Sequence, residues 1–252
     1  MRAVIFLNGA PDPPGLLRRI AGRADLVAAA DGGARYALNA GVVPDLVIGD
    51  MDSLGDAREI EECGALLERY PVRKDKMDGH LAVLAVRDRG ATAVDLLCAA
   101  GGQFSALFAV PHILLAAERI GLRATMMAGW GQAFVLEAGS RMVSGSPQDS
   151  VSVFAFAGSA TGVTLEGFGY PLEDARLETG DTLGFHNELI GGAGRVSVGG
   201  GTLLVIQEAK KTTPETKWQR KRASTAATVP RMAPRTVGLK KPASPSTPKA
   251  SG

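Results

Sequence analysis

The first half of the chain alternates short apolar runs with segments of helical periodicity, and this alternation limits the fold more than any other feature. Apolar runs that read as buried strands lie at residues 3–7, 26–30, 46–48, 66–70, 93–98 and 124–128. Between them, residues 15–21, 34–40, 78–87 and 107–119 have apolar side chains at helical spacing. This order predicts an α/β fold with a doubly wound parallel sheet. Pro111 should either kink the last of these helices or delay its start.

The pattern changes after about residue 129. Short runs separated by glycine-rich turns lie at residues 151–156, 162–165, 182–185, 195–198 and 202–206. Such spacing is typical of a small antiparallel β-sandwich or barrel-like domain. The sequence therefore predicts an α/β domain over residues 1–128 and a β domain over residues 129–208.

Residues 209–252 differ in composition from the rest. They hold eleven Lys or Arg residues, one acid (Glu215) and six prolines, without apolar periodicity. This composition predicts a disordered basic tail. Residues 1–208 carry 17 basic and 25 acidic groups. An acidic body is a poor electrostatic match for nucleic acid, so we expect no nucleic-acid binding by the folded part.

The N-terminus and the cysteines bear on the compartment. The N-terminal apolar run is too short for a membrane span and lacks a signal-peptide cleavage site, so no membrane partner is expected. Cys63 and Cys98 lack metal-ligand spacing and are interpreted as reduced thiols rather than a disulfide. Both observations favour the cytoplasm.

Two acids follow the third predicted strand directly. Asp50 and Asp52 are two residues apart, and on extended backbone such side chains point the same way. Ligands bind at the carboxyl ends of strands in open α/β sheets. The alternative is an ordinary turn in which Asp52 or Ser53 caps the next helix.

A second acidic pair, Asp75 and Asp78, lies where the helix at residues 78–87 is expected to begin. A spacing of three places both carboxylates on one helix face, although helix capping would explain one of them. Two acidic pairs at strand ends of one sheet would together provide oxygen ligands for Mg²⁺. A cation would also relieve the repulsion between the carboxylates.

Weaker signals follow two other strands. Asp31, Gly32 and Gly33 end one strand and open a helix, where backbone N–H groups can approach a phosphate. A tight turn with an Asp cap explains the same residues. Asn8, followed by Gly9 after the first strand, is weaker still.

These motifs, in this order, resemble those of the thiamine pyrophosphokinases. The resemblance covers residues 1–208 and rests on AADGGARYALNAGVVPDLVIGDMDSL, KDKMD, GFGYPL and LGFHNE. It implies a thiamine diphosphokinase, in which the thiamine hydroxyl attacks the β-phosphorus of ATP and AMP leaves. It further implies a homodimer, with ATP at the sheet edge of the α/β domain and thiamine between domains of two subunits.

The resemblance also implies roles for individual residues. The acids Asp50, Asp52, Asp75 and Asp78 would be catalytic and would hold Mg²⁺. The nucleotide and its diphosphate would be lined by Asn8, Asp31, Gly32, Gly33, Gly102 and Gln103. Thiamine would contact Tyr170, His186, Asn187 and Glu188. A tyrosine ring can stack on cationic thiamine, although Tyr170 would serve equally well as a core residue of the β domain.

Three departures from the family pattern are visible. Gly-Gly-Arg-x-Asp-His is replaced by GGQFSA at residues 101–106, and Gln cannot replace the charge of an Arg that holds phosphate. Met77 stands where the family has Thr, and His186 where it has Ser. Two alternatives therefore stay open: an impaired member that binds nucleotide or thiamine, and a pyrophosphokinase for another heterocyclic alcohol.

Overall fold

The computed structural model of the chain describes residues 1–51, 60 and 62–210, and residues 1–210 form one compact unit. Asp52 and the tail predicted to be disordered lie outside the described residues, apart from the first two tail positions. Among the described helices, none is both long and apolar enough to cross a membrane.

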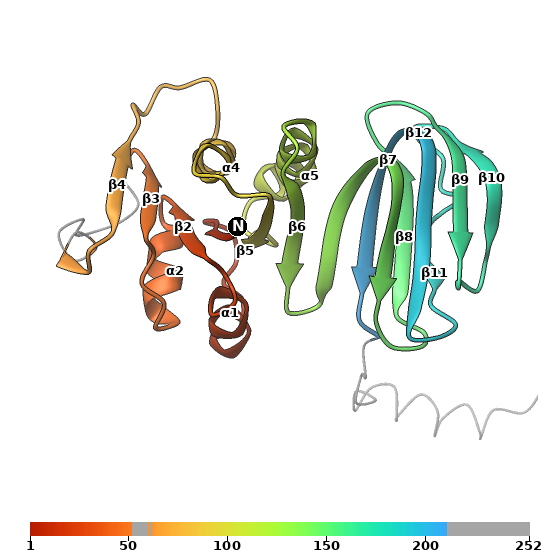
Figure 1. Cartoon of the computed structure of the whole chain (residues 1–252), viewed down its shortest axis with the longest axis horizontal. Coiled ribbons are helices and arrows are strands. Elements are labelled where there is room, and N and C mark those ends of the chain that lie inside the picture. The colour runs from red at the N-terminus through yellow and green to blue at the C-terminus, as the bar shows by residue number, and fades with distance from the viewer. Residues whose placement is uncertain (52–59, 61, 211–252) are drawn as a thin grey trace, which may run out of the picture. The chain divides into compact units, whose positions relative to one another are not determined.

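The strands of the first half form a parallel sheet in the order β6-β5-β1-β2-β3-β4 (Figure 1). Their bounds are β1 Arg2–Phe6, β2 Leu26–Ala30, β3 Leu46–Gly49, β4 Leu66–Arg69, β5 Ala93–Leu97 and β6 Arg123–Ala128. The strand order reverses next to β1, because β2 pairs with one side of it and β5 with the other. Such a reversal opens a crevice at the carboxyl ends of the strands.

Helices cover both faces of this sheet (Figure 1). Their bounds are α1 Pro14–Ala21, α2 Gly33–Asn39, α4 Asp78–Asp88 and α5 Phe104–Arg119. Ile5 of β1 belongs to the core on the side of α4 and α5, and Phe6 to the core on the side of α1 and α2. Alternate residues of a strand point to opposite faces, so a strand that is apolar throughout can serve two cores. The predicted doubly wound parallel sheet is confirmed.

The second half is antiparallel, as predicted. Its strands are β7 Gly131–Ser144, β8 Ser150–Ala155, β9 Ala160–Glu166, β10 Leu172–Leu177, β11 Asn187–Glu188 and β12 Ala193–Glu208. β12 pairs with β7 along most of its length, and with β8 and β9 on its other side. Phe134, Phe168 and Leu203 are buried in the core of this part. β7 also pairs with β6, so the two halves share one sheet, and the domain boundary at residues 128 and 129 stays a prediction.

Several predicted elements need correction. Residues 182–185, predicted as a strand, form a turn. The runs at 195–198 and 202–206 belong to a single strand, β12, whose pairing with β7 shifts register between Val198 and Thr202. Three glycines at 199–201 make this irregularity possible, and in the sequence they look like the end of a strand.

Periodicity missed two strands and misplaced the start of one helix. β7 and β10 were not predicted, because charged residues such as Glu137 and Arg141 interrupt their apolar pattern. α5 begins at Phe104, three residues before the predicted start, and contains Pro111. The alternative of a delayed start is therefore wrong. The first turn of α5 has no capping side chain and no acidic residue, so the sequence gives no signal for a helix start at Phe104.

Candidate functional site

A cleft of about 180 Å³ lies at the carboxyl ends of the parallel strands, where the strand order reverses. The loop after β1 is held to the loop after β5 by backbone hydrogen bonds, from Gly9 N to the Cys98 carbonyl (2.9 Å) and from Ala10 N to the Ala100 carbonyl (3.0 Å). The lining comes from the ends of β1, β2 and β5 and from the starts of α4 and α5: Leu7, Asn8, Gly9, Ala30, Asp31, Met77, Asp78, Gly79, Ala99, Gly101, Ala106, Val110 and Ile113.

Two predicted acids meet in this cleft at Gly49, the last residue of β3. A Cβ atom at Gly49 would lie 3.0 Å from the Asp31 Cβ and 3.3 Å from the Asp78 Oδ1. Gly49 also has a φ of +154°, a conformation that other residues rarely adopt. The absence of a side chain at this position therefore lets the carboxylates at the end of β2 and at the start of α4 approach each other.

Lys74 lies between two of the acids. Its Nζ is 3.0 Å from the Asp78 Oδ1 and 3.5 Å from the Asp50 Oδ2. The Lys74 and Asp50 side chains are each 12% exposed, so this contact is largely shielded from water. Lys74 was not singled out from the sequence. Its spacing of four before Asp78, inside an acidic motif, is the signal that could have identified it.

The ionisation of these groups reflects burial and their neighbours. Burial raises the pKa of Asp78 above its ordinary value, the hydrogen bond and charge of Lys74 oppose this, and the charges of Asp31 and Asp50 reinforce it. Burial lowers the pKa of Lys74, but its hydrogen bonds and charge interactions with Asp78 and Asp50 outweigh this and raise it overall. A cation that binds beside a carboxyl group with a raised pKa stabilises the ionised form of that group.

The structure does not support every detail of the predicted acidic pairs. Met51 has a φ of +69°, so the backbone between Asp50 and Asp52 is not extended as the spacing argument assumed. Asp75 is exposed and precedes α4, so it does not share a helix face with Asp78. Among the described residues, no three Asp, Glu, His or Cys side chains form a ready-made metal site.

The glycines after β2 are required by close packing. A Cβ at Gly33 would lie 2.1 Å from the Phe6 carbonyl oxygen, and one at Gly32 would lie 2.6 Å from the Asn8 Oδ1. These contacts support the turn interpretation of the motif. They also place the Asn8 side chain against the start of α2, at the wall of the cleft.

The glycine-rich segment at residues 101–106 contributes to the same cleft. Gly101 and Ala106 line it, together with Met77 from the loop before α4. Gln103 caps α5 without a side-chain hydrogen bond and is exposed, as is Gly102. Met77 and Ala106, identified from the sequence as departures from the expected pattern, thus make one wall of the cleft apolar.

The residues predicted to contact thiamine lie together in the β part. Asn187 is 4% exposed and accepts hydrogen bonds at Oδ1 from the Tyr170 N–H and the Glu188 N–H, both at 2.9 Å. Its Nδ2 donates to the Tyr170 carbonyl (2.6 Å). The Tyr170 side chain is 70% exposed, so the interpretation of Tyr170 as a core residue is wrong. Asn187 fixes the backbone that presents this ring.

His186 stands beside them on the turn before β11. It has a φ of +60°, and its backbone N–H donates to the Ser152 Oγ (3.1 Å). Its Nδ1 is 3.5 Å from the Ser150 Oγ. None of Tyr170, His186, Asn187 and Glu188 lines the cleft of the acids, so the structure does not bring the two predicted groups together within that cleft.

One acid of structural importance was missed. The Asp12 Oδ2 accepts a hydrogen bond from the Cys98 N–H (3.1 Å), and its Oδ1 accepts one from the Gly129 N–H (2.8 Å). Asp12 therefore joins the loops that follow β5 and β6 at the edge of the cleft. A carboxylate between prolines gives no periodic signal in the sequence.

Comparison with known proteins assigns the chain to a family. The family described as thiamin pyrophosphokinase, catalytic domain, matches residues 17–126, and that described as thiamin pyrophosphokinase, vitamin B1 binding domain, matches residues 143–203. The chain belongs to the thiamin pyrophosphokinase family. Family members use ATP and bind thiamine. Asp31, Asp50 and Asp78 fall in the first match, and Tyr170 and Asn187 in the second.

Individual thiamin pyrophosphokinases match this chain over most of its length. The chain is 25% identical over 180 residues to thiamine pyrophosphokinase of Bacillus subtilis, which covers 70% of this chain and 84% of the relative. The crystal structure of thiamin pyrophosphokinase from Geobacillus thermodenitrificans has a TM-score of 0.71 and 29% identity, over 84% of this chain and 99% of that one. The Bacillus subtilis crystal structure, at 24% identity and a TM-score of 0.73, supports the fold over 83% of this chain and 100% of that chain.

Proposed function

We propose that this chain is a thiamine diphosphokinase, which transfers a diphosphate from ATP to the thiamine hydroxyl and releases AMP. The observation that carries the proposal is that Asp31 and Asp78 meet at Gly49 while Lys74 contacts both Asp78 and Asp50 at the same sheet edge. Diphosphate transfer depends on positioning and on neutralising phosphate charge rather than on covalent chemistry by the protein. The cleft supplies groups suited to both tasks.

The acid residues fit a divalent cation. Asp31 and Asp50 raise the pKa of Asp78 through their charges, and Lys74 already neutralises part of this negative charge. Mg²⁺ commonly takes one or two protein carboxylates and completes its shell with water and phosphate oxygens. Asp50 and Asp78 would hold it, with Asp52 and Asp75 as further predicted ligands. When bound, Mg²⁺ would neutralise charge on the phosphates of ATP.

The remaining groups of the cleft would bind and orient. Lys74 can turn from the carboxylates toward a phosphate oxygen, since an ammonium group is a point charge on a flexible stem. Asn8, Asp31, Gly32 and Gly33 would line the nucleotide, with Gly102 and Gln103 from the opposite loop. Tyr170 would stack on the thiamine ring, and His186 and Glu188 would also contact thiamine.

A homodimer is part of the proposal. The cleft lacks Tyr170, His186, Asn187 and Glu188, so a second copy would have to supply them. The β part presents exposed apolar side chains suited to such an interface: Tyr170 (70% exposed), Ile190 (66%), Leu183 (58%) and Phe185 (58%). We place the enzyme in the cytoplasm, because it uses ATP and both cysteines are free thiols.

The test is direct. Purified full-length protein is incubated with ATP, MgCl₂ and thiamine, and AMP and thiamine diphosphate are quantified by chromatography. Both products should form in equal amounts and only when thiamine is present. A mass measurement by light scattering at micromolar concentration should give a dimer. Absence of both products under these conditions contradicts the proposal.

One observation favours a second candidate. The apolar wall formed by Met77 and Ala106, with exposed Gln103 beside it, lacks the charged groups of the family motif. A protein that binds ATP or thiamine without turnover would tolerate this loss, and a kinase for another heterocyclic alcohol would use an altered pocket. Calorimetric binding without AMP release identifies the binder. AMP release with a pterin alcohol, but not with thiamine, identifies the altered enzyme.

A further inference from the structure

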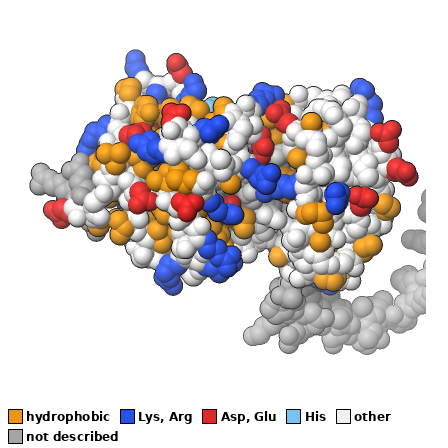
Figure 2. Space-filling view, in the orientation of Figure 1, with side chains coloured by type: hydrophobic (Ala, Val, Ile, Leu, Met, Phe, Trp, Pro, Cys, Tyr) orange, Lys and Arg blue, Asp and Glu red, His pale blue; other side chains and the backbone are white. Residues whose placement is uncertain are grey.

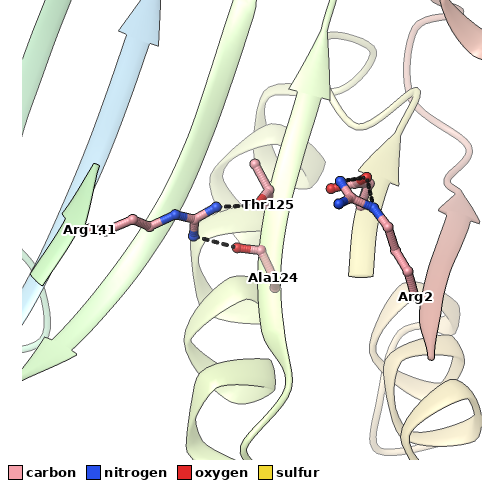
Figure 3. A network of polar contacts seen from close by, with 5 residues as sticks. Arg2, Ala124, Thr125 and Arg141 are labelled. Atoms are coloured by element: carbon pink, nitrogen blue, oxygen red, sulfur yellow. Dashed lines mark hydrogen bonds and ion pairs between the residues drawn. The ribbon is translucent and has the colours of Figure 1, made fainter. Parts of the chain in front are cut away.

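A cluster of polar residues interrupts one face of the sheet (Figure 3). Val4 of β1 lies in the core beside α1 and α2, and its partner in register on β5 is Asp95, whose partner on β6 is Thr125. Paired residues point to the same face. Asp95 and Thr125 are 3% and 6% exposed, so this face changes from an apolar core to buried polar groups within two strands.

Arginine residues approach these polar groups from two sides. Arg2 donates to the Asp95 Oδ2 through Nε (3.0 Å) and Nη2. Arg141 of β7 reaches across to β6, where its Nη2 donates to the Thr125 Oγ1 (2.6 Å) and its Nη1 to the Ala124 carbonyl (3.5 Å) (Figure 3). The Arg141 guanidinium also lies 4.0 Å over the Phe134 ring. Its hydrogen-bond partners are all neutral.

A third arginine completes the cluster. Arg123, the first residue of β6, lines a cavity of about 340 Å³ together with Arg2, Asp95, Thr125 and Arg141. The Arg123 side chain makes no hydrogen bond or ion pair with any residue that the structure describes, so its donors are available to a ligand. Figure 2 shows Lys and Arg side chains together near the middle of the face in view.

The charge of this cavity is unbalanced. This cavity is lined by three guanidinium groups and one carboxylate, that of Asp95. The Glu118 carboxylate lines the neighbouring cavity rather than this one. Burial lowers the pKa of Arg141, and the charges of Arg123 and Arg2 lower it further, against the opposing effect of Glu118 and Asp95. An anion would relieve this repulsion and would find arginine donors in the forked geometry that suits phosphate oxygens.

We propose that this cavity, formed by Arg2, Arg123 and Arg141, is a binding site for a phosphoryl dianion, separate from the cleft of the acids. Arg2, Ala93 and Arg123 are the first residues of their parallel strands, whereas the cleft lies at the carboxyl ends. The site therefore does not depend on the proposed diphosphokinase activity. Its ligand would connect β1 and β6 with β7 and so stabilise the fold on binding.

The experiment measures phosphate binding to the full-length protein. Inorganic phosphate, diphosphate and AMP are titrated in separate calorimetric experiments at low ionic strength, and melting temperature is followed by scanning fluorimetry. Arg123→Gln removes an exposed charge and should leave the fold intact. It should weaken phosphate binding about tenfold, because charge-assisted bonds to phosphate are lost. Arg176→Gln, at an exposed arginine of β10 that pairs with Glu178, is the matched control and should bind as the wild type, because β9 and β12 separate β10 from β7.

The three ligands separate the sources of the phosphoryl group. Phosphate or diphosphate binding that requires Arg123 supports a free inorganic anion, and AMP binding that requires Arg123 supports a phosphate carried by a nucleotide. Arg141→Gln should show the same loss as Arg123→Gln, with an additional fall in melting temperature. If no ligand binds, or if Arg123→Gln binds all three as tightly as Arg176→Gln does, the proposal is overturned.

Discussion

The Nζ of Lys74 lies 3.0 Å from the Oδ1 of Asp78, on the loop that leads into α4. Lys74 also contacts the Asp50 Oδ2 at 3.5 Å, so one ammonium group neutralises carboxylates from two parts of the sheet edge. We expect a metal ion and Lys74 to compete for the same charge, because both would reduce the repulsion between these acids.

Lys74→Met should therefore make the protein depend on Mg²⁺ for stability. Loss of a largely shielded cation leaves Asp50 and Asp78 facing each other and should cost about 1 to 3 kcal/mol of unfolding free energy in EDTA. Added MgCl₂ should restore more of the melting temperature in this variant than in the wild type. Lys76→Met, an exposed neighbour, is the control. Identical responses of the two variants to MgCl₂ would contradict a shared site.

Asp78→Asn should reduce diphosphate transfer by several orders of magnitude while the fold persists, because a carboxylate that would hold the phosphate-neutralising Mg²⁺ is lost. The pKa of Asp78 is raised, so activity of the wild type should fall on acidification at a higher pH than an ordinary Asp would give. Lys74→Met removes an effect that lowers this pKa and should move the acidic limb further up. A pH–rate profile of each protein measures the direction in which the acidic limb shifts. An unchanged acidic limb in Lys74→Met would count against Asp78 as the titrating group.

The triple reversion Gln103→Arg, Ser105→Asp, Ala106→His should raise AMP release with thiamine by tenfold or more, which needs only about 1.4 kcal/mol at the transition state. An acid at position 105 suits the first turn of α5, which has none now. Ala106 already lines the cleft, so a histidine there would reach it. Gln103→Arg alone is the comparison, since the three residues need not act additively. A folded triple variant without gain would favour the binder or the altered substrate.

Truncation should separate the tail from the folded body. Removing residues 211–252 should leave the melting temperature unchanged. Removing residues 209–252 should lower it by several degrees, at a cost of about 1 to 3 kcal/mol. The longer deletion removes the Lys210 N–H that donates to the buried Asp149 Oδ1 (2.8 Å).

The effect of the longer deletion should depend on pH. Burial raises the pKa of Asp149, but the hydrogen bonds from the Lys210 and Ser146 N–H groups and from Gln207 outweigh this and lower the pKa overall. The destabilisation should therefore be present at neutral pH and disappear as the pH falls below the ordinary Asp value. Equal melting temperatures of the two truncated proteins would contradict this.

The two cysteines should differ in reactivity. Cys63 is exposed and should react with a thiol reagent at pH 8, whereas buried Cys98 should react only after unfolding. Burial raises the pKa of Cys98 to about 11 from 9.0. The unfolded thiol loses its proton first, so stability falls as the pH rises from 9 to about 11. The decline in the unfolding free energy should reach at most about 3 kcal/mol, and Cys98→Ala should not show it. Rapid labelling of both thiols in the native protein would contradict the burial of Cys98.

The sequence by itself determined the parallel sheet and the location of its polar strand ends. Residues 26–30 and 46–48 are continuous apolar runs, and such runs are stable only when both faces of a strand are buried. The antiparallel half was harder to predict from the sequence, because β7 and β10 combine one buried face with charged residues and irregular register. Their pairing depends on β12 and β9, which are distant in sequence.

The motifs also identified Asp31, Asp50 and Asp78, because acids after buried strands need a partner or a ligand. Only the tertiary structure decided that Lys74 and Gly49 are what allow these carboxylates to lie together, and that Asp75 precedes α4 instead of sharing a helix face with Asp78. Likewise, Arg2, Arg123 and Arg141 are scattered in the sequence and carry no motif. They line one cavity only because parallel strand starts are aligned in the sheet and β7 returns beside β6. Local pattern specifies which faces are apolar, but the proximity of like charges is set by strand order and register, which long-range pairing alone defines.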